Sequence, residues 1–198
     1  MNYPEIEIKR LNGDEPIIDS SRRSISDVNK FWQWAYSNIY DNAERGALAE
    51  YLVACSLGVD KKVRSNWEDC DLLTADGIKV EVKSSAYLQS WGQDKLSNLT
   101  FGIQPTRGWN RHENKYTEDV ERRSDVYVFC VQKHEEQETL NPLDLSQWDF
   151  YILPTRVLNQ EATKQKTAAL SSLIKMGAEQ CEYENLAQRI RDLFFETE

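Results

Sequence analysis

The chain has 198 residues, which is the size of one domain or of a large domain with additions. It is 40% apolar and contains only eight Gly and five Pro, so it is neither a disordered nor a low-complexity protein. The net charge of −9 argues against a surface that coats nucleic acid all over. A local basic groove stays open, because the 24 Lys and Arg residues are interspersed with the acidic ones.

The cysteines and the apolar runs indicate the compartment. Four scattered cysteines without CxxC spacing predict reduced thiols, and with only two histidines a zinc site is not expected. The longest apolar runs have the length of a strand, and the first ten residues lack the apolar stretch of a signal peptide. We therefore expect a cytoplasmic protein without a membrane segment.

The predicted elements begin, after a loosely held segment over 1–25, with a helix from Ser26 or Asp27. A second helix follows between an N-cap at Asp41 and a C-cap at Gly58. Next come strands over 69–74 and 78–84, an irregular stretch over 85–97, a strand over 99–104 and a charged loop over 105–123. The chain then continues with a central strand over 126–131, a strand over 150–153, and helices over 160–176 and 183–195. This order indicates an α/β fold in which helices cover a sheet.

One carboxylate stands alone within the second helix. Glu50 is the only charged residue between Gly46 and Gly58, and its neighbours one turn away are small or apolar. A carboxylate in such surroundings loses its hydration unless a metal ion, a cation or hydrogen-bond donors replace the water. Glu50 is therefore either part of a metal site or one half of a buried ion pair.

The strands over 69–74 and 78–84 predict a hairpin whose register is decided by the hydrophobic pattern. A three-residue loop at 75–77, with Gly77 left-handed, gathers the apolar side chains on one face and the charged ones on the other. This register places Asp71 directly opposite Glu81, roughly 5 Å apart at Cβ, where like charges repel. Lys83 on the same face and a divalent cation would compensate, although a solvated face with screening Lys residues is an equally good explanation.

Taken together, the helix acid, Asp71, the turn and the run Glu81-Val82-Lys83 resemble the PD-(D/E)xK nuclease superfamily. The matching segment is residues 45–85. The resemblance implies a restriction-endonuclease-like core, with a mixed β-sheet flanked by helices. It implies a single domain over 1–198, made of an N-terminal extension with one helix over 1–40, a nuclease-like core over 41–155 and C-terminal helices over 156–198.

By the same resemblance, Asp71, Glu81 and Glu50 would be metal-binding and catalytic acids, and Lys83 would orient or deprotonate the attacking water. The cofactor would be Mg²⁺, with Mn²⁺ as a substitute, and the reaction the hydrolysis of DNA phosphodiester bonds. Next to the cation and the phosphate, Lys83 is expected to have a lowered pKa.

The sequence departs from the family at two places. Cys70 stands where the Pro of the motif name is expected, and Gln89 and Gln93 lack the Tyr that completes the glutamine motif of the exonuclease branch. An endonuclease of a restriction, defence or repair system is therefore favoured over an exonuclease. The alternative is an inactive interaction module of the same fold, with the acids in ion pairs, and Asp69 is an alternative ligand to Asp71.

Contacts with DNA are expected from basic residues after the hairpin, chiefly Lys95, Arg107 and Arg111, with Arg122 and Arg123 as further candidates. The segment 105–123 also contains acidic residues, so a solvated lid explains it equally well. A homodimer is expected if both strands of a duplex are cut, because one such site cuts one strand.

Overall fold

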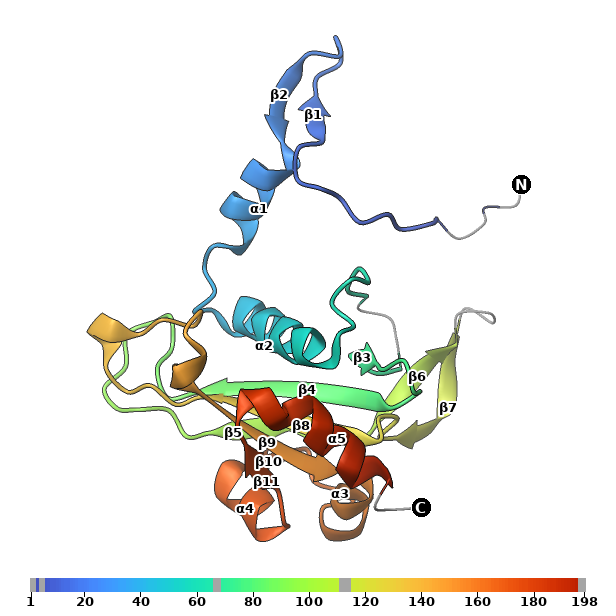
Figure 1. The fold of residues 1–198 in the computed structure, drawn as a ribbon, viewed down its shortest axis with the longest axis vertical. Coiled ribbons are helices and arrows are strands. Elements are labelled where there is room, and N and C mark those ends of the chain that lie inside the picture. Colours follow the sequence, from blue (N-terminus) through green and yellow to red (C-terminus); the bar gives the residue numbers. More distant parts are fainter. Residues whose placement is uncertain (1–2, 4–5, 66–68, 111–114, 196–198) are drawn as a thin grey trace.

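A mixed five-stranded sheet forms the centre of the computed structural model, which describes all of residues 1–198 except 1–2, 4–5, 66–68, 111–114 and 196–198 (Figure 1). Its strands, in spatial order, are β11 (Glu179–Cys181), β9 (Trp148–Pro154), β8 (Val126–Gln132), β4 (Lys79–Ala86) and β3 (Leu72–Leu73). Strands β4 and β8 pair in parallel, and the other neighbours are antiparallel. The predicted central strand is confirmed, since every residue of β8 is buried.

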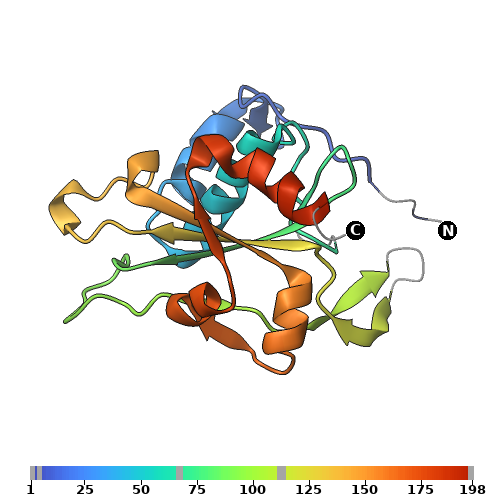
Figure 2. The same ribbon diagram turned by 60° about the horizontal axis from the view of Figure 1, so that its bottom comes forward.

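Helices cover both faces of this sheet, as Figure 2 shows. Helices α2 (Asn42–Leu57) and α5 (Leu186–Phe195) pack on one face through Val53 and Ile190, against Val80 and Val128. The other face carries α3 (Thr155–Glu161), α4 (Leu170–Lys175) and a two-stranded sheet of β5 (Thr100–Gly102) and β10 (Thr167–Ala169). The predicted α/β class is therefore confirmed. Among the described residues, no helix has the length and apolarity needed to cross a membrane.

Helix α2 begins and ends where its capping residues predict. The side chain of Asp41 accepts a hydrogen bond from the backbone N–H of Ala43, which satisfies one of the free donors at the helix start. Gly58 adopts a left-handed conformation with φ of 71° and closes the helix with bonds to Ala54 and Cys55. These caps fix the position of Glu50 in the middle of the helix.

The hairpin that follows has the predicted register. Leu72 pairs with Val80 and Leu73 with Lys79, and the turn between them contains Gly77 with φ of 89°. Asp71 comes directly before the first pair of this ladder, and its side chain accepts a hydrogen bond from the backbone N–H of Val82, next to Glu81. Strand β3 is shorter than predicted, because residues 69–71 bend away from the ladder.

The N-terminal extension contains more structure than the sequence predicted. A hairpin of β1 (Pro16–Ile18) and β2 (Ser24–Asp27) precedes helix α1 (Val28–Tyr36), which begins about where it was predicted, with Asp27 as its N-cap. We refer to residues 6–36 as the N-terminal arm, and Figure 1 shows it projecting from the sheet and its helices. No residue of α1 is buried, so its apolar face does not belong to the core.

The charged segment over 105–123 is a hairpin and not the predicted loop. Strands β6 (Thr106–Asn110) and β7 (Lys115–Glu121) pair with a bulge, and the ring centroids of Trp109 and Tyr116 lie 5.0 Å apart across them. Its residues are mostly exposed, so there is no alternation of apolar and polar residues by which sequence could reveal the strands.

The predicted helix over 160–176 is also wrong. Helix α3 starts five residues earlier, directly after β9, and ends at Glu161; β10 and α4 follow. The polar run over 163–167 has no apolar residue with which to bury a helix face, and Ala168 instead pairs with Phe101 of β5. The final predicted helix is confirmed as α5, preceded by β11 and a 3₁₀ turn over Tyr183–Asn185. Two further 3₁₀ turns, Gln137–Thr139 and Leu145–Gln147, lie between β8 and β9.

Candidate active site

Two of the predicted acids, Asp71 and Glu81, meet at the edge of the sheet where β3 begins. Asp71 Oδ2 accepts a hydrogen bond of 2.7 Å from the backbone N–H of Val82, which holds its side chain against β4. Glu81 projects from the amino-terminal half of β4, and its Oε1 accepts a 2.6 Å hydrogen bond from Lys83 Nζ. The structure therefore brings together three of the four predicted catalytic residues through one hairpin.

The surroundings of Asp71 make its ionisation costly. Burial and the neighbouring negative charge of Glu81 raise the pKa of Asp71 from 3.8 to about 6, although Lys83 and the bond from Val82 oppose the shift. One positive charge is therefore too little to balance both acids at this position.

The pKa of Lys83 is shifted in the direction opposite to the one expected from the sequence. Burial lowers its pKa, but the charges of Glu81 and Asp71 outweigh burial and raise it above the ordinary value. The prediction of a lowered pKa assumed a bound cation, and in this structure the acids dominate. Lys83 is therefore a protonated ammonium here, able to donate hydrogen bonds.

Glu50 is paired with a cation from the loop that follows α2. Arg64 holds both carboxylate oxygens, with Nε 2.5 Å from Oε2 and Nη2 2.7 Å from Oε1, and only 14% of the Glu50 side chain is exposed. The ion-pair alternative for Glu50 is thus present in the structure. Glu50 still affects the other acids, since its charge contributes to the raised pKa of Asp71.

The carboxylates of the site meet the basic requirement of a magnesium ion for oxygen ligands. Among the described residues, no three carboxylate, imidazole or thiol groups are gathered closely enough to hold a metal ion. Asp71 and Glu81 nevertheless offer oxygen ligands that lack sufficient counter-charge, and Mg²⁺ is commonly bound through one or two carboxylates together with water and phosphate. The two acids fit a magnesium site of that kind, with Glu50 outside it while Arg64 holds it.

Ser124 is a site residue that the sequence did not reveal. Its Oγ donates a 2.9 Å hydrogen bond to Glu81 Oε2, and only 4% of the residue is exposed. Together with the bond from Lys83, this contact holds both oxygens of Glu81. A single Ser before an apolar strand carries no signal of such a contact, because the partner lies 43 residues away.

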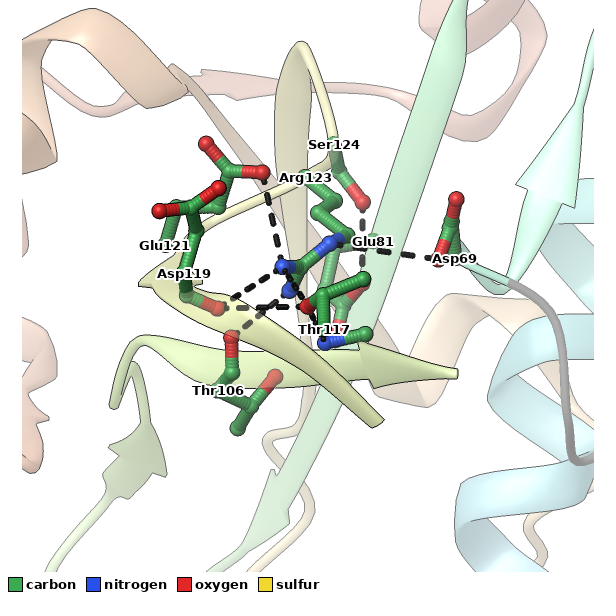
Figure 3. Close-up of polar contacts among 9 residues, drawn as sticks. Asp69, Glu81, Thr106, Thr117, Asp119, Glu121, Arg123 and Ser124 are labelled. Atoms are coloured by element: carbon green, nitrogen blue, oxygen red, sulfur yellow. Dashed lines mark hydrogen bonds and ion pairs between the residues drawn. The ribbon is translucent and has the colours of Figure 1, made fainter. Parts of the chain in front are cut away.

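Arg123 fastens the β6–β7 hairpin beside this serine (Figure 3). Its guanidinium donates to the carbonyl of Thr106 at 2.6 Å, to Thr117 Oγ1 at 2.9 Å and to the carbonyl of Asp119 at 3.0 Å. A Cβ on Gly108 would lie 2.5 Å from Arg123 Nε, so glycine leaves the space that the side chain occupies. Arg123 therefore links both strands of the hairpin to the segment that contains Ser124.

The other predicted DNA contacts are dispersed. Lys95 lies in the loop after the carboxyl end of β4, whereas the acids lie nearer its amino end, and Arg107 is exposed on β6. Arg111 lies outside the described residues. Arg122 is buried and donates to the carbonyls of Ile103, Leu158 and Ala162, so it serves the fold and not a surface.

A cleft of about 1030 Å³ lies beside the acids. Glu50, Arg64 and Asp71 form part of its lining, and Trp109 and Thr117 contribute from the β6–β7 hairpin. Glu81 and Lys83 are outside the lining and are linked to it electrostatically through Asp71. The arrangement offers an open approach to one member of the acid pair.

Comparison with protein families gives a match over most of the chain. The family model described as bacteriophage T4 endonuclease IV matches residues 15–172, which include the arm hairpin, α1, all the predicted catalytic residues and Ser124. A search of curated proteins found no match to this chain.

Proposed function

The chain belongs to the bacteriophage T4 endonuclease IV family, and from this premise we propose that it is a Mg²⁺-dependent endonuclease of DNA with a PD-(D/E)xK-type site. The family name supports a nuclease that acts on DNA. The metal dependence and the kind of site are our inference from the residues around Asp71 and Glu81. A role in restriction, defence or repair is compatible with this chemistry.

The observation that carries the proposal is the crowding of two carboxylates beside an open cleft. Asp71 keeps a pKa raised to about 6 even with Lys83 nearby. Strongly perturbed acids in a cleft are typical of functional sites, because a structural ion pair is usually balanced in charge. A divalent cation would supply the missing positive charge.

Each residue has a distinct role in the proposed reaction. Asp71 and Glu81 would hold the ion, and Ser124 would orient Glu81 for that task. The bound Mg²⁺ would stabilise negative charge on the phosphate and acidify a water molecule. The Lys83 ammonium would donate to a phosphate oxygen or orient the attacking water. Arg64 would hold Glu50 in the wall of the cleft and balance its charge.

The second candidate is an inactive interaction module of the same fold. The ion pairs of Glu81 with Lys83 and of Glu50 with Arg64 favour it, since each acid has a cationic partner. Metal binding separates the two candidates, because an ion pair that serves only stability has no need of a second cation.

The test is cleavage of circular and linear DNA, single-stranded and double-stranded, with Mg²⁺ or Mn²⁺, by the wild-type protein and by Lys83→Ala. We expect metal-dependent cutting that Lys83→Ala abolishes. Equal cutting by both proteins would contradict the assignment of the site. Calorimetric titration with Mn²⁺ is the second measurement, and absence of both binding and cutting would favour the interaction module.

The chain provides a matched control for this variant. Lys133 Nζ lies 2.7 Å from Asp149 Oδ1 in another lysine–carboxylate pair of the central sheet, away from the cleft. Lys133→Ala removes the same kind of side chain and the same kind of contact. It should leave cutting and metal binding unchanged.

A further inference from the structure

The outer side of the cleft is formed by the N-terminal arm. Ile8, Lys9, Arg10 and Leu11 line it together with Trp32 of α1, and they come from a part of the chain far in sequence from Asp71. Figure 1 shows the arm passing above α2 and the start of the loop that follows it. The arm therefore forms one part of the cleft in which Glu50 and Asp71 also lie.

The arm is held in this position by specific contacts. Arg10 Nη1 donates a 3.2 Å hydrogen bond to the carbonyl of Asp60, in the loop after α2. At the other end of the segment, the carbonyl of Gly13 accepts a 2.8 Å bond from the N–H of Asn29 at the start of α1. Gly13 has φ of 104°, and a Cβ there would lie 3.3 Å from the ring of Trp32. Arg10 thus ties residues 8–11 to the loop after α2, and Gly13 ties the segment to α1 of the same arm.

Charge separates the two sides of the cleft. The arm contributes two cations, Lys9 and Arg10, and no acid to the lining, and both are exposed. The rest of the lining contains four acids, Glu50, Asp60, Asp69 and Asp71, and three cations, Lys62, Arg64 and Lys79. In a protein with a net charge of −9, an acid-free basic segment facing the catalytic acids is suited to a polyanion that must approach them.

We propose that residues 8–11 and Trp32 form a clamp that holds the sugar–phosphate backbone of DNA over Asp71. The proposal rests on the proposed function, since it takes DNA as the substrate. Lys9 and Arg10 bind phosphates, and the apolar side chains of Ile8, Leu11 and Trp32 pack against sugars. The clamp gives the acidic protein a local binding surface that the distribution of Lys and Arg in the sequence does not reveal.

The test measures DNA affinity without cutting. All proteins carry Glu81→Gln, and binding of a fluorescein-labelled oligonucleotide, as a single strand and as a duplex, is followed by anisotropy over a range of salt concentrations. The double change Lys9→Ala and Arg10→Ala should weaken binding about 10-fold or more and lower the salt dependence by about one unit of slope per phosphate contact. Lys9→Glu alone, which keeps the bond from Arg10 to Asp60, should weaken binding as well.

The matched control lies on the same arm outside the cleft. Arg22→Ala with Lys30→Ala removes two exposed cations that do not line it, and should leave the affinity unchanged. Unchanged affinity in the Lys9 and Arg10 variants, or an equal loss in the control, would overturn the clamp. An altered sedimentation coefficient with unaltered affinity would overturn it as well, in favour of an interface with a second copy.

The binding assay also separates failure of the clamp from failure of the proposed function. If the wild-type protein does not cut DNA while Lys9 and Arg10 control its affinity, the clamp stands and the nuclease proposal fails. If cutting depends on Lys83 while the DNA affinity is unchanged in the Lys9 and Arg10 variants, the nuclease proposal stands and the clamp fails.

Discussion

Two lysine–carboxylate pairs at the central sheet have nearly the same N···O distance and different surroundings. Lys83 lies 2.6 Å from Glu81 near the cleft, and Lys133 lies 2.7 Å from Asp149 at the carboxyl end of β8. Beside the first pair lies a further acid, Asp71, whose pKa is raised by burial and by Glu81. The distance within an ion pair therefore does not identify a functional site; the uncompensated acid beside it does.

The most direct test of the difference between the two pairs is to remove one charge from each. Glu81→Gln should lower DNA cleavage about 100-fold or more, because a carboxylate that holds the cation is lost while the shape of the side chain is kept. Asp149→Asn makes the same chemical change in the other pair and should leave the cleavage rate unaltered. Cleavage rates measured on one DNA substrate decide this, and equal rates for all three proteins would remove Glu81 from the site.

Ser124→Ala should weaken Mn²⁺ binding and cleavage about 10-fold, because the hydrogen bond that orients Glu81 is lost while the carboxylate remains. Calorimetric titration gives the affinity. Ser124→Thr retains the hydroxyl and should restore most of it, which a purely structural role for this serine would not require. A thermal unfolding curve for both variants controls for loss of the fold.

Asp71→Asn should stabilise the metal-free protein at pH 8 by about 1 to 3 kcal/mol, since ionising Asp71 in the folded state is unfavourable. The folded pKa is raised, so the protonated acid favours folding below pH 3.8, and this contribution is lost as the pH rises through about 6. Urea unfolding between pH 4 and 8 measures the effect. The wild-type protein should lose stability relative to the variant over this range, and parallel curves would contradict the shift.

The smallest effect is expected at the second pair. Asp149→Asn should change the free energy of unfolding by less than about 1 kcal/mol, because Lys133 is 43% exposed and solvent screens the interaction. Urea unfolding at neutral pH is again the measurement. A loss of several kcal/mol would mean that the two pairs differ less than their surroundings indicate.

The parts of the site that lie close together in sequence were predictable. The caps at Asp41 and Gly58 and the left-handed Gly77 are local signals, and the separation of apolar from charged faces predicted the register in which Leu72 pairs with Val80. A hairpin with one apolar face has little freedom in register, because a slip by one residue would expose its core side chains.

What depends on distant contacts was not predictable. The partners Arg64 and Ser124 reach the acids through loops, and neither stands in a recognisable pattern. The β6–β7 hairpin lacks alternating burial, and the arm contributes no buried residue from α1. Such elements are specified by surface contacts, which leave no periodicity in the chain.

The parallel pairing of β4 with β8 has a consequence for folding kinetics. Asp71 and Glu81 meet through a local hairpin, an event of roughly 1–10 μs in isolated peptides, whereas Ser124 reaches Glu81 only after a crossover between the two strands has closed. Non-local pairing of this kind is slow, because loop entropy is lost before contacts compensate. A refolding chain should therefore form the acid pair first and regain the ordered Glu81 later, so that recovery of hairpin structure precedes recovery of metal affinity.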